Sequence, residues 1–167
     1  MTQINPKATT ILLGVLVLIM LIFACSTSKR HGPSDFVDVL LSAPETARMY
    51  GREFVLETYI YCDLMPVIPP DNLDLIAAIR VVAVDSLRIP GSLDADRLWL
   101  IKGQEIAWET ELSIGSAAYP FILEKVARQG PCCGPGTFVE VVVRLVDTES
   151  RRTFLLRASH QGVGAVY

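Results

Sequence analysis

The sequence predicts an all-β domain, and three observations support that fold class. Short segments rich in β-branched and aromatic residues recur at intervals of about 8–12 residues beyond residue 35. Clusters of Gly, Pro, Asn, Asp and Ser, which form turns, separate these segments. No long segment repeats its apolar residues at helical spacing. We therefore expect an antiparallel β-sandwich, with an immunoglobulin-like topology favoured by the strand count and a small β-barrel as the second choice.

The first part of the domain contains one segment of clear strand character. Residues 53–63 lack Gly and Pro and are rich in β-branched and aromatic side chains, so they predict a strand. Residues 35–41 are expected to form an edge strand, with a short helix as the alternative. Residues 44–51 are expected to form a turn, with one helical turn as the alternative. Residues 65–72 hold three prolines, which remove backbone donors, and predict a loop.

Residues 75–85 predict a second strand that is apolar almost throughout. Such a run is typical of a strand buried on both faces, although a buried helix would show the same composition. Three valines, Val81, Val82 and Val84, favour the strand. The Pro-Gly pair within residues 89–92 then predicts a turn.

Residues 97–101 and 104–112 predict a hairpin that turns at Lys102-Gly103. Its second arm alternates, with one set of side chains expected in the core and the other in water. The core set is Ile106, Trp108, Thr110 and Leu112, and the solvated set is Glu105, Ala107, Glu109 and Glu111. We expect Trp99 and Trp108 to face each other across the hairpin as a structural pair.

The last part of the domain predicts a series of strands around one rigid loop. Residues 121–127 are expected to form a strand, with a helix as the alternative. Residues 130–136 contain three glycines and two prolines, a composition that excludes regular structure. Residues 137–147 predict a strand, residues 153–159 its partner, and residues 162–167 a last short strand.

The N-terminal 24 residues have the composition of a signal peptide or a membrane anchor. Residues 8–25 form an uncharged, largely apolar run, and Lys7 precedes it. A run of about 18 residues lies at the lower limit for a helix that crosses a bilayer. Length alone leaves a cleaved signal peptide and an uncleaved anchor helix open.

The end of this run, Ile22-Phe23-Ala24-Cys25, resembles the lipobox of bacterial lipoproteins. Ile22, Ala24 and Cys25 match the pattern, and Phe23 stands where the family usually has Ala or Ser. The resemblance covers the first 25 residues. It implies cleavage before Cys25 and attachment of acyl chains such as palmitate to Cys25. Ser26 follows in place of the aspartate that retains lipoproteins at the inner membrane, so the resemblance also implies transfer to the outer membrane.

Three further cysteines are candidate site residues, as a disulfide or as reactive thiols. An exported domain can keep a disulfide, and Cys62 is expected to pair with Cys132 or Cys133. Cys132 and Cys133 are poor partners for each other, because adjacent Cα atoms lie about 3.8 Å apart and disulfides usually span about 4.4–6.8 Å. The alternatives are a buried thiol at Cys62, a strained bond between the adjacent cysteines, and two loop thiols without partners.

No metal or cofactor site is predicted. Because His31 lies in the expected tether, His160 is the only histidine of the domain. The number of residues between His160 and the cysteines does not match the spacing of a known metal site. Two groups of loop carboxylates lack calcium-loop spacing and are interpreted as solvated turn residues. They are Asp63, Asp71 and Asp74 in one group, and Asp94 and Asp96 in the other.

These observations predict three regions: a signal peptide or anchor over 1–24, a lipid-attachment cysteine with a flexible tether over 25–34, and one β-sandwich domain over 35–167. The net charge is −3 and both signs are dispersed, so nucleic acid is not an expected partner. No catalytic residue or motif is found, and we do not expect an enzyme.

We therefore expect a membrane-anchored, extracytoplasmic binding or structural module of the bacterial cell envelope, with a protein partner. Its expected location is the outer membrane or the periplasm-facing side, and a single-pass anchor in the inner membrane is the alternative. The alternative function is an envelope thiol enzyme or redox sensor that uses Cys132 and Cys133.

Overall fold

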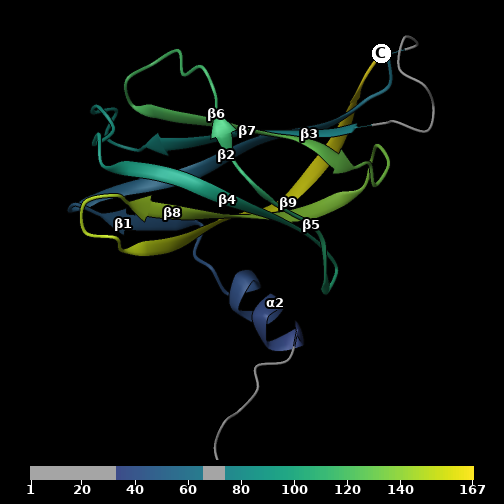
Figure 1. Cartoon of the computed structure of the whole chain (residues 1–167), viewed down its shortest axis with the longest axis horizontal. Coiled ribbons are helices and arrows are strands. Elements are labelled where there is room, and N and C mark those ends of the chain that lie inside the picture. Colours follow the sequence, from purple (N-terminus) through teal and green to yellow (C-terminus); the bar gives the residue numbers. More distant parts are fainter. Residues whose placement is uncertain (1–32, 66–73) are drawn as a thin grey trace, which may run out of the picture. The chain divides into compact units, whose positions relative to one another are not determined.

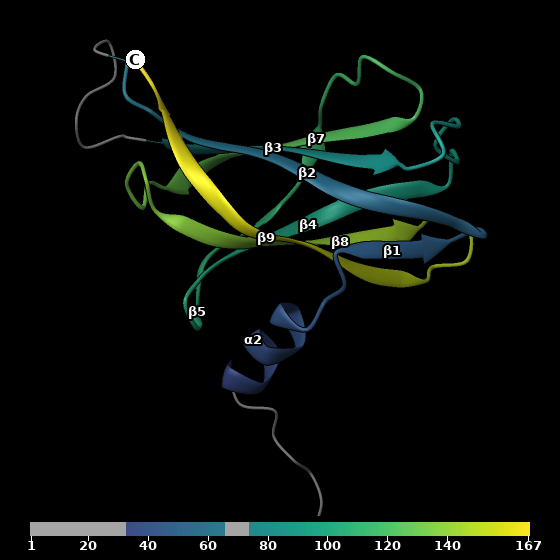
Figure 2. The same cartoon turned by 180° about the vertical axis from the view of Figure 1, so that it is seen from behind.

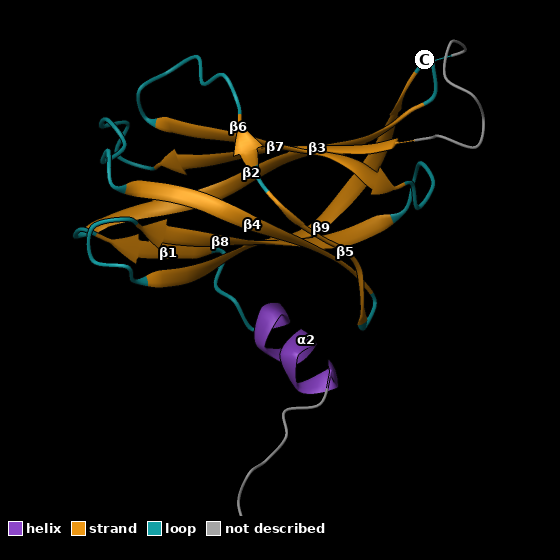
Figure 3. Ribbon diagram, in the orientation of Figure 1, coloured by secondary structure: helices purple, strands orange, loops and turns teal. Residues whose placement is uncertain are grey.

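The computed structural model describes residues 33–65 and 74–167. The predictions for the signal peptide, Cys25 and the tether up to residue 32, and for most of the loop over 65–72, lie outside these residues. The described part is one short helix and nine strands (Figures 1 and 3), so the all-β prediction is confirmed. The elements are α2 (Pro33–Leu41), β1 (Thr46–Met49), β2 (Arg52–Asp63), β3 (Asp74–Ala83), β4 (Leu93–Lys102), β5 (Glu105–Glu111), β6 (Ser113–Ile114), β7 (Ile122–Pro131), β8 (Phe138–Asp147) and β9 (Thr153–Val166).

The strands form one sheet that is nearly closed into a barrel. Their order is β5-β4-β8-β9-β2-β3-β7-β6, and β1 pairs with β2 outside this path. The sheet curls until β4 and β5 contact β7. The immunoglobulin-like sandwich that the strand count favoured is not confirmed, and the second choice, a small barrel, describes the sheet more closely.

The long strand β9 makes the curling of the sheet possible. Its first part pairs antiparallel with β8, and its last part, residues 163–166, pairs parallel with β2. Figure 2 shows β9 crossing from the β8 side to the β2 side of the sheet. His160, with a φ of 53°, lies at a register shift within the β8–β9 pairing, between the pairs Val141–Ala158 and Val139–Gln161, and pairing with β2 begins at Val163. The two strands predicted over 153–159 and 162–167 are therefore one bent strand.

The barrel interior holds the main apolar core. Alternate residues of every long strand point inward, as the period of a half-buried strand requires. Fully buried members come from five strands: Phe54, Ile79, Leu98, Val141 and Leu156. The strands predicted over 53–63, 75–85, 121–127 and 137–147 are confirmed with small changes of boundary.

The edge strand predicted over 35–41 is wrong, because this segment forms α2. Val37 and Leu40 lie three residues apart on one helical face and are both buried. They pack on the outside of the barrel against Trp99, Ile101 and Val142. A nine-residue helix gains its stability from such packing more than from its own sequence. Within residues 33–65 and 74–167, no helix has the length and apolar character needed to cross a membrane.

The turn predicted over 44–51 is also wrong in part, since β1 occupies Thr46–Met49 and pairs with the start of β2. The pairing with β2 explains why residues 46–49 form a strand and not a turn. Ala47 and Met49 are buried, whereas the two residues between and before them are exposed. This is the alternation of an edge strand on a core, and it is too short to be distinctive in the sequence.

The predicted pair of Trp99 and Trp108 is wrong, because a bulge changes the register of the β4–β5 hairpin. Ile101 lies opposite Ile106, but the next pair is Leu100 with Trp108, so β5 has one extra residue. A shift of one residue moves the following side chains to the other face. Trp108 consequently packs against the barrel core, half-buried, while Trp99 and Ile106 belong to the cluster beneath α2. The common core face predicted for Ile106, Trp108, Thr110 and Leu112 is therefore wrong for Ile106.

Candidate functional site

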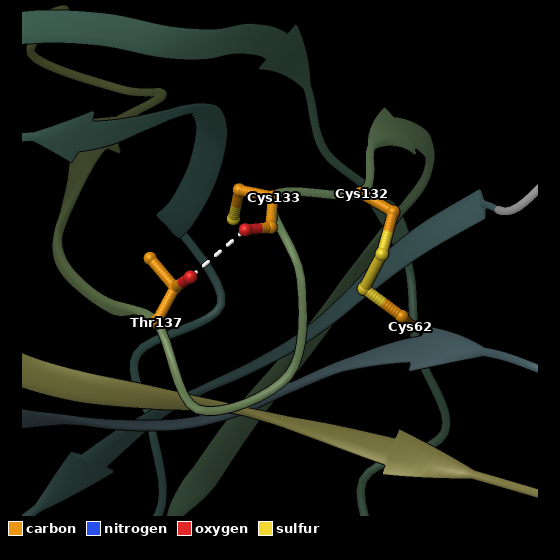
Figure 4. Close-up of a disulfide and its surroundings, with 4 residues drawn as sticks. All are labelled: Cys62, Cys132, Cys133 and Thr137. Carbon is orange, nitrogen blue, oxygen red and sulfur yellow. Dashed lines mark hydrogen bonds between the residues drawn. A yellow bond between two sulfur atoms is a disulfide. The ribbon is translucent and has the colours of Figure 1, made fainter.

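A disulfide joins Cys62, near the end of β2, to Cys132, directly after β7 (Figure 4). The two Cα atoms lie 5.7 Å apart, within the usual disulfide range. This is one of the two pairings that the sequence left open. Because β2 and β7 are the two neighbours of β3, the bond connects non-adjacent strands at one end of the barrel. It therefore fixes the end of the sheet next to the loop that follows β7.

Cys133 is the free cysteine of the described residues, and it lies half-buried in the loop between β7 and β8. Its carbonyl oxygen accepts a hydrogen bond of 2.8 Å from Thr137 Oγ1. Gly134 and Gly136 have φ values of 87° and 82°, which an L side chain rarely adopts. Figure 4 shows the Cys133 side chain directed away from the disulfide. The rigid loop predicted over 130–136 is shorter than expected, since β7 continues to Pro131.

The carboxylates Asp94 and Asp96 each pair with one cation and do not converge on a common site. Asp94 Oδ1 lies 2.5 Å from Lys125 Nζ. Asp96 accepts two hydrogen bonds from Arg144, of 2.8 and 2.6 Å, and this guanidinium lowers the pKa of Asp96. Both aspartates therefore act as ion-pair partners between strands.

The other predicted loop residues are equally dispersed. Asp63 Oδ1 accepts the backbone N–H of Met65 at 3.1 Å, Asp74 begins β3, and Asp71 lies outside the described residues. His160 stacks on Phe138, with ring centroids 4.1 Å apart. In the part of the chain that the structure describes, no three metal-ligating side chains come together.

Lys125 is a buried cation that the sequence analysis missed. It points into the barrel between Leu123 and Ala127, and its side chain is only 6% exposed. Its ion pair with Asp94 joins β7 to β4 where the barrel is nearly closed. The alternation of residues along β7 could have identified Lys125, because it gives this lysine an inward position that an apolar residue would normally occupy.

A different part of the barrel surface has no element of the described chain packed over it. We name it the open face, and it consists of outward residues of β2, β3 and β7. They are Val55, Glu57, Tyr59, Tyr61, Ala78, Arg80, Val82, Ile122, Glu124 and Val126, whereas Ile76, which shares this side of β3, is buried. In Figures 1 and 2, α2 lies on the β8 side of the sheet, away from β3 and β7.

The strand register arranges the open face in rows. Val55, Val82 and Ile122 are neighbours in one apolar row. A second row of register neighbours is mostly apolar and contains Tyr59, Ala78 and Val126. The row between these two is charged.

The charged row consists of Glu57, Arg80 and Glu124, which are register partners on adjacent strands. Arg80 Nε lies 3.1 Å from Glu124 Oε2, whereas Glu57 has no ion pair within the described residues. Tyr59 is 62% exposed and borders a shallow cleft of about 340 Å³ that Glu57, Ala78 and Arg80 also line. The open face thus offers apolar surface, one exposed aromatic ring and a carboxylate without an ion pair among the described residues.

No protein-family model matches the sequence, and the searches of curated proteins and of solved structures found no match either.

Proposed function

We propose that the protein is a membrane-anchored, extracytoplasmic module that acts by binding a protein partner through the open face. The observation that carries this proposal is β3. Its inward residues fill the barrel, and its outward residues Ala78 and Val82 are apolar as well, with the half-exposed Arg80 between them. Strands of this composition normally have packed elements on both sides. Among the described residues, no helix or strand packs on the outward side of β3 at Ala78, Arg80 and Val82, which supports a partner there.

The disulfide supports an oxidising compartment outside the cytoplasm. Disulfides such as the one between Cys62 and Cys132 persist in exported proteins and are rare in cytosolic ones. This agrees with the lipobox-like segment that ends at Cys25, and with an anchor formed by lipid on Cys25 or by an N-terminal helix. Several acyl chains on one cysteine would hold the domain stably at a membrane surface.

The thiol hypothesis has less support. It required two reactive cysteines at positions 132 and 133, and Cys132 is bonded to Cys62. Cys133 remains, and Arg128, the nearest cation in the sequence, lies exposed on β7. A reactive thiol needs an electropositive setting, and one exposed arginine is little support for it.

The binding proposal is tested by photo-crosslinking in the cells that produce the protein. A photoreactive phenylalanine derivative replaces Tyr59, which lies on the open face. The matched control replaces Phe138, an aromatic residue on β8 that is 55% exposed. We expect a covalent adduct with another protein chain from position 59 and none from position 138. Equal yields from both positions, or no adduct from position 59, would contradict the proposal.

A further inference from the structure

We propose that the partner of the open face is the same face of a second copy of this chain, related by a two-fold axis that runs parallel to β2 and β3 and midway between them. The inference rests on the proposed function, because it takes the open face as the binding surface. It adds the identity of the partner and the geometry of the contact. A two-fold contact of this kind uses one patch on both copies, so the patch must be complementary to itself.

The charged row decides which two-fold axis the face permits. An axis between β2 and β3 places each residue against the register partner of that residue in the other copy. Glu57 and Arg80 are register partners, so Glu57 of each copy meets Arg80 of the other. An axis along the charged row, across the strands, would instead place Glu57 against Glu57 and Arg80 against Arg80. Like charges in contact oppose binding strongly, so the charge pattern excludes this second axis. A parallel axis between β3 and β7 would place Arg80 against Glu124 of the other copy, but Arg80 already pairs with its own Glu124, and Glu57 would gain no partner. The axis between β2 and β3 is the one that gives Glu57 a cation.

The apolar rows are compatible with the same axis. Val55 meets Val82 of the other copy, because these two residues are register partners. Tyr59 meets Ala78 of the other copy, and the small side chain of Ala78 leaves room for the exposed ring of Tyr59. Each contact occurs twice. The face therefore joins apolar residues to apolar residues on both sides of the charged row.

The ion pairs among the described residues of a single chain leave Glu57 and part of Arg80 free to pair with the second copy. Arg80 uses Nε toward Glu124, and its side chain is about half exposed. Glu57, the cross-strand partner of Arg80, makes no ion pair in the described part of the chain. In the dimer, Arg80 would lie between its own Glu124 and Glu57 of the second copy. Partial removal from water would make this charge pair stronger than an exposed one.

The test uses two charge-reversal variants. Each variant alone is expected to lose dimerisation, and a mixture of the two is expected to regain it. In a pair of Glu57→Arg chains, the introduced arginine meets Arg80 of the other copy. In a pair of Arg80→Glu chains, the introduced glutamate meets Glu57 of the other copy. We expect each variant to lose at least about tenfold in homodimer affinity, because like charges then face each other.

In a mixed dimer of the two variants, both contacts join opposite charges, so an equimolar mixture should regain dimerisation. Sedimentation equilibrium of the full chain in detergent measures the homodimers. Co-purification through two different C-terminal tags measures the mixed dimer.

Two control variants carry the same charge changes away from the open face. Glu149→Arg and Arg151→Glu lie exposed in the turn between β8 and β9, and we expect both to dimerise like the unmodified chain. Circular dichroism and thermal melting verify that all four variants fold. A monomeric unmodified chain, or a mixture that stays monomeric, would overturn the inference. The proposed function would survive either outcome if Tyr59 still crosslinked to a different protein.

Discussion

At the residue scale, a few side chains fix the ends of the barrel and its seam, which is the line where β7 meets β4 and β5. Arg52 is the most connected of them. It donates hydrogen bonds of 2.7 Å to both carboxylate oxygens of Asp85 and further bonds to the carbonyl oxygens of Leu87 and Arg88. One guanidinium therefore ties the start of β2 to the connection between β3 and β4.

This contact predicts a specific dependence of stability on pH. The hydrogen bond from Arg52, followed by that from the backbone N–H of Leu87, lowers the pKa of Asp85 from 3.8 to about 2. A carboxyl whose pKa falls on folding stabilises the protein above its unfolded pKa, and the stabilisation disappears as the pH falls through the folded pKa. Urea unfolding should show Asp85→Asn less stable than the unmodified chain at pH 6, with the difference shrinking between about pH 4 and pH 2. A difference independent of pH would contradict this, and Glu149→Gln serves as the control.

Gly130 predicts a second effect at this scale. A Cβ atom on Gly130 would lie 2.6 Å from Cε3 of Trp108, so only glycine permits the close contact of β7 with β5. We expect Gly130→Ala to destabilise the domain by about 1–3 kcal/mol, the usual cost of overpacking. Gly91→Ala is the control, since a Cβ there meets nothing within 4 Å. Chemical denaturation measures both, and equal effects would show that Trp108 does not close the seam.

At the scale of elements, composition and alternation in the sequence predicted the long strands, and the failures have tertiary causes. Residues 53–63 and 137–147 alternate over many positions, so their type was clear before their partners were known. The helix α2 is short and depends on Trp99 and Val142 for its buried face. The bulge in β5 has no signature in the sequence, and it moved Trp108 away from Trp99.

For the candidate sites too, the sequence showed the residue types, whereas their pairing depended on the tertiary structure. The cysteines were visible in the sequence, but the choice of Cys132 over Cys133 depends on where β7 ends. The apolar character of β3 predicted burial on two faces, whereas Arg80, in the outward row of β3, is half exposed in the described chain. The opposition of Glu57 and Arg80 could not be predicted, since it depends on the register between two strands.

The packing of α2 yields a prediction for this element. Leu40 is fully buried against the outside of the barrel, and Val39, its neighbour, is 44% exposed. We expect Leu40→Ala to lower the free energy of unfolding by about 2–5 kcal/mol, because it leaves a cavity. Val39→Ala should change it by less than about 0.5 kcal/mol, as exposed substitutions usually do. Similar effects of the two substitutions would mean that α2 does not pack on β4 and β8 in solution.

At the scale of the whole molecule, the described domain combines a nearly closed barrel with the open face, on which no described helix or strand packs. The barrel is held by its apolar core, the disulfide from Cys62 to Cys132 and the ion pair of Lys125 with Asp94. In the proposed function, the open face is the binding surface, and the N-terminal segment ending at Cys25 would hold that face near a membrane.

The most direct test of an anchored, exported module is the intact mass of the chain purified from its own membranes, after alkylation under denaturing, non-reducing conditions. We expect a chain that begins at Cys25, carries acyl mass there, and takes one alkyl group, on Cys133. Cys25→Ala should lose the acyl mass and retain residues 1–24, because lipoprotein processing depends on the cysteine. A full-length chain without acyl mass, alkylated at Cys25, Cys62, Cys132 and Cys133, would contradict both the lipid anchor and the oxidising compartment.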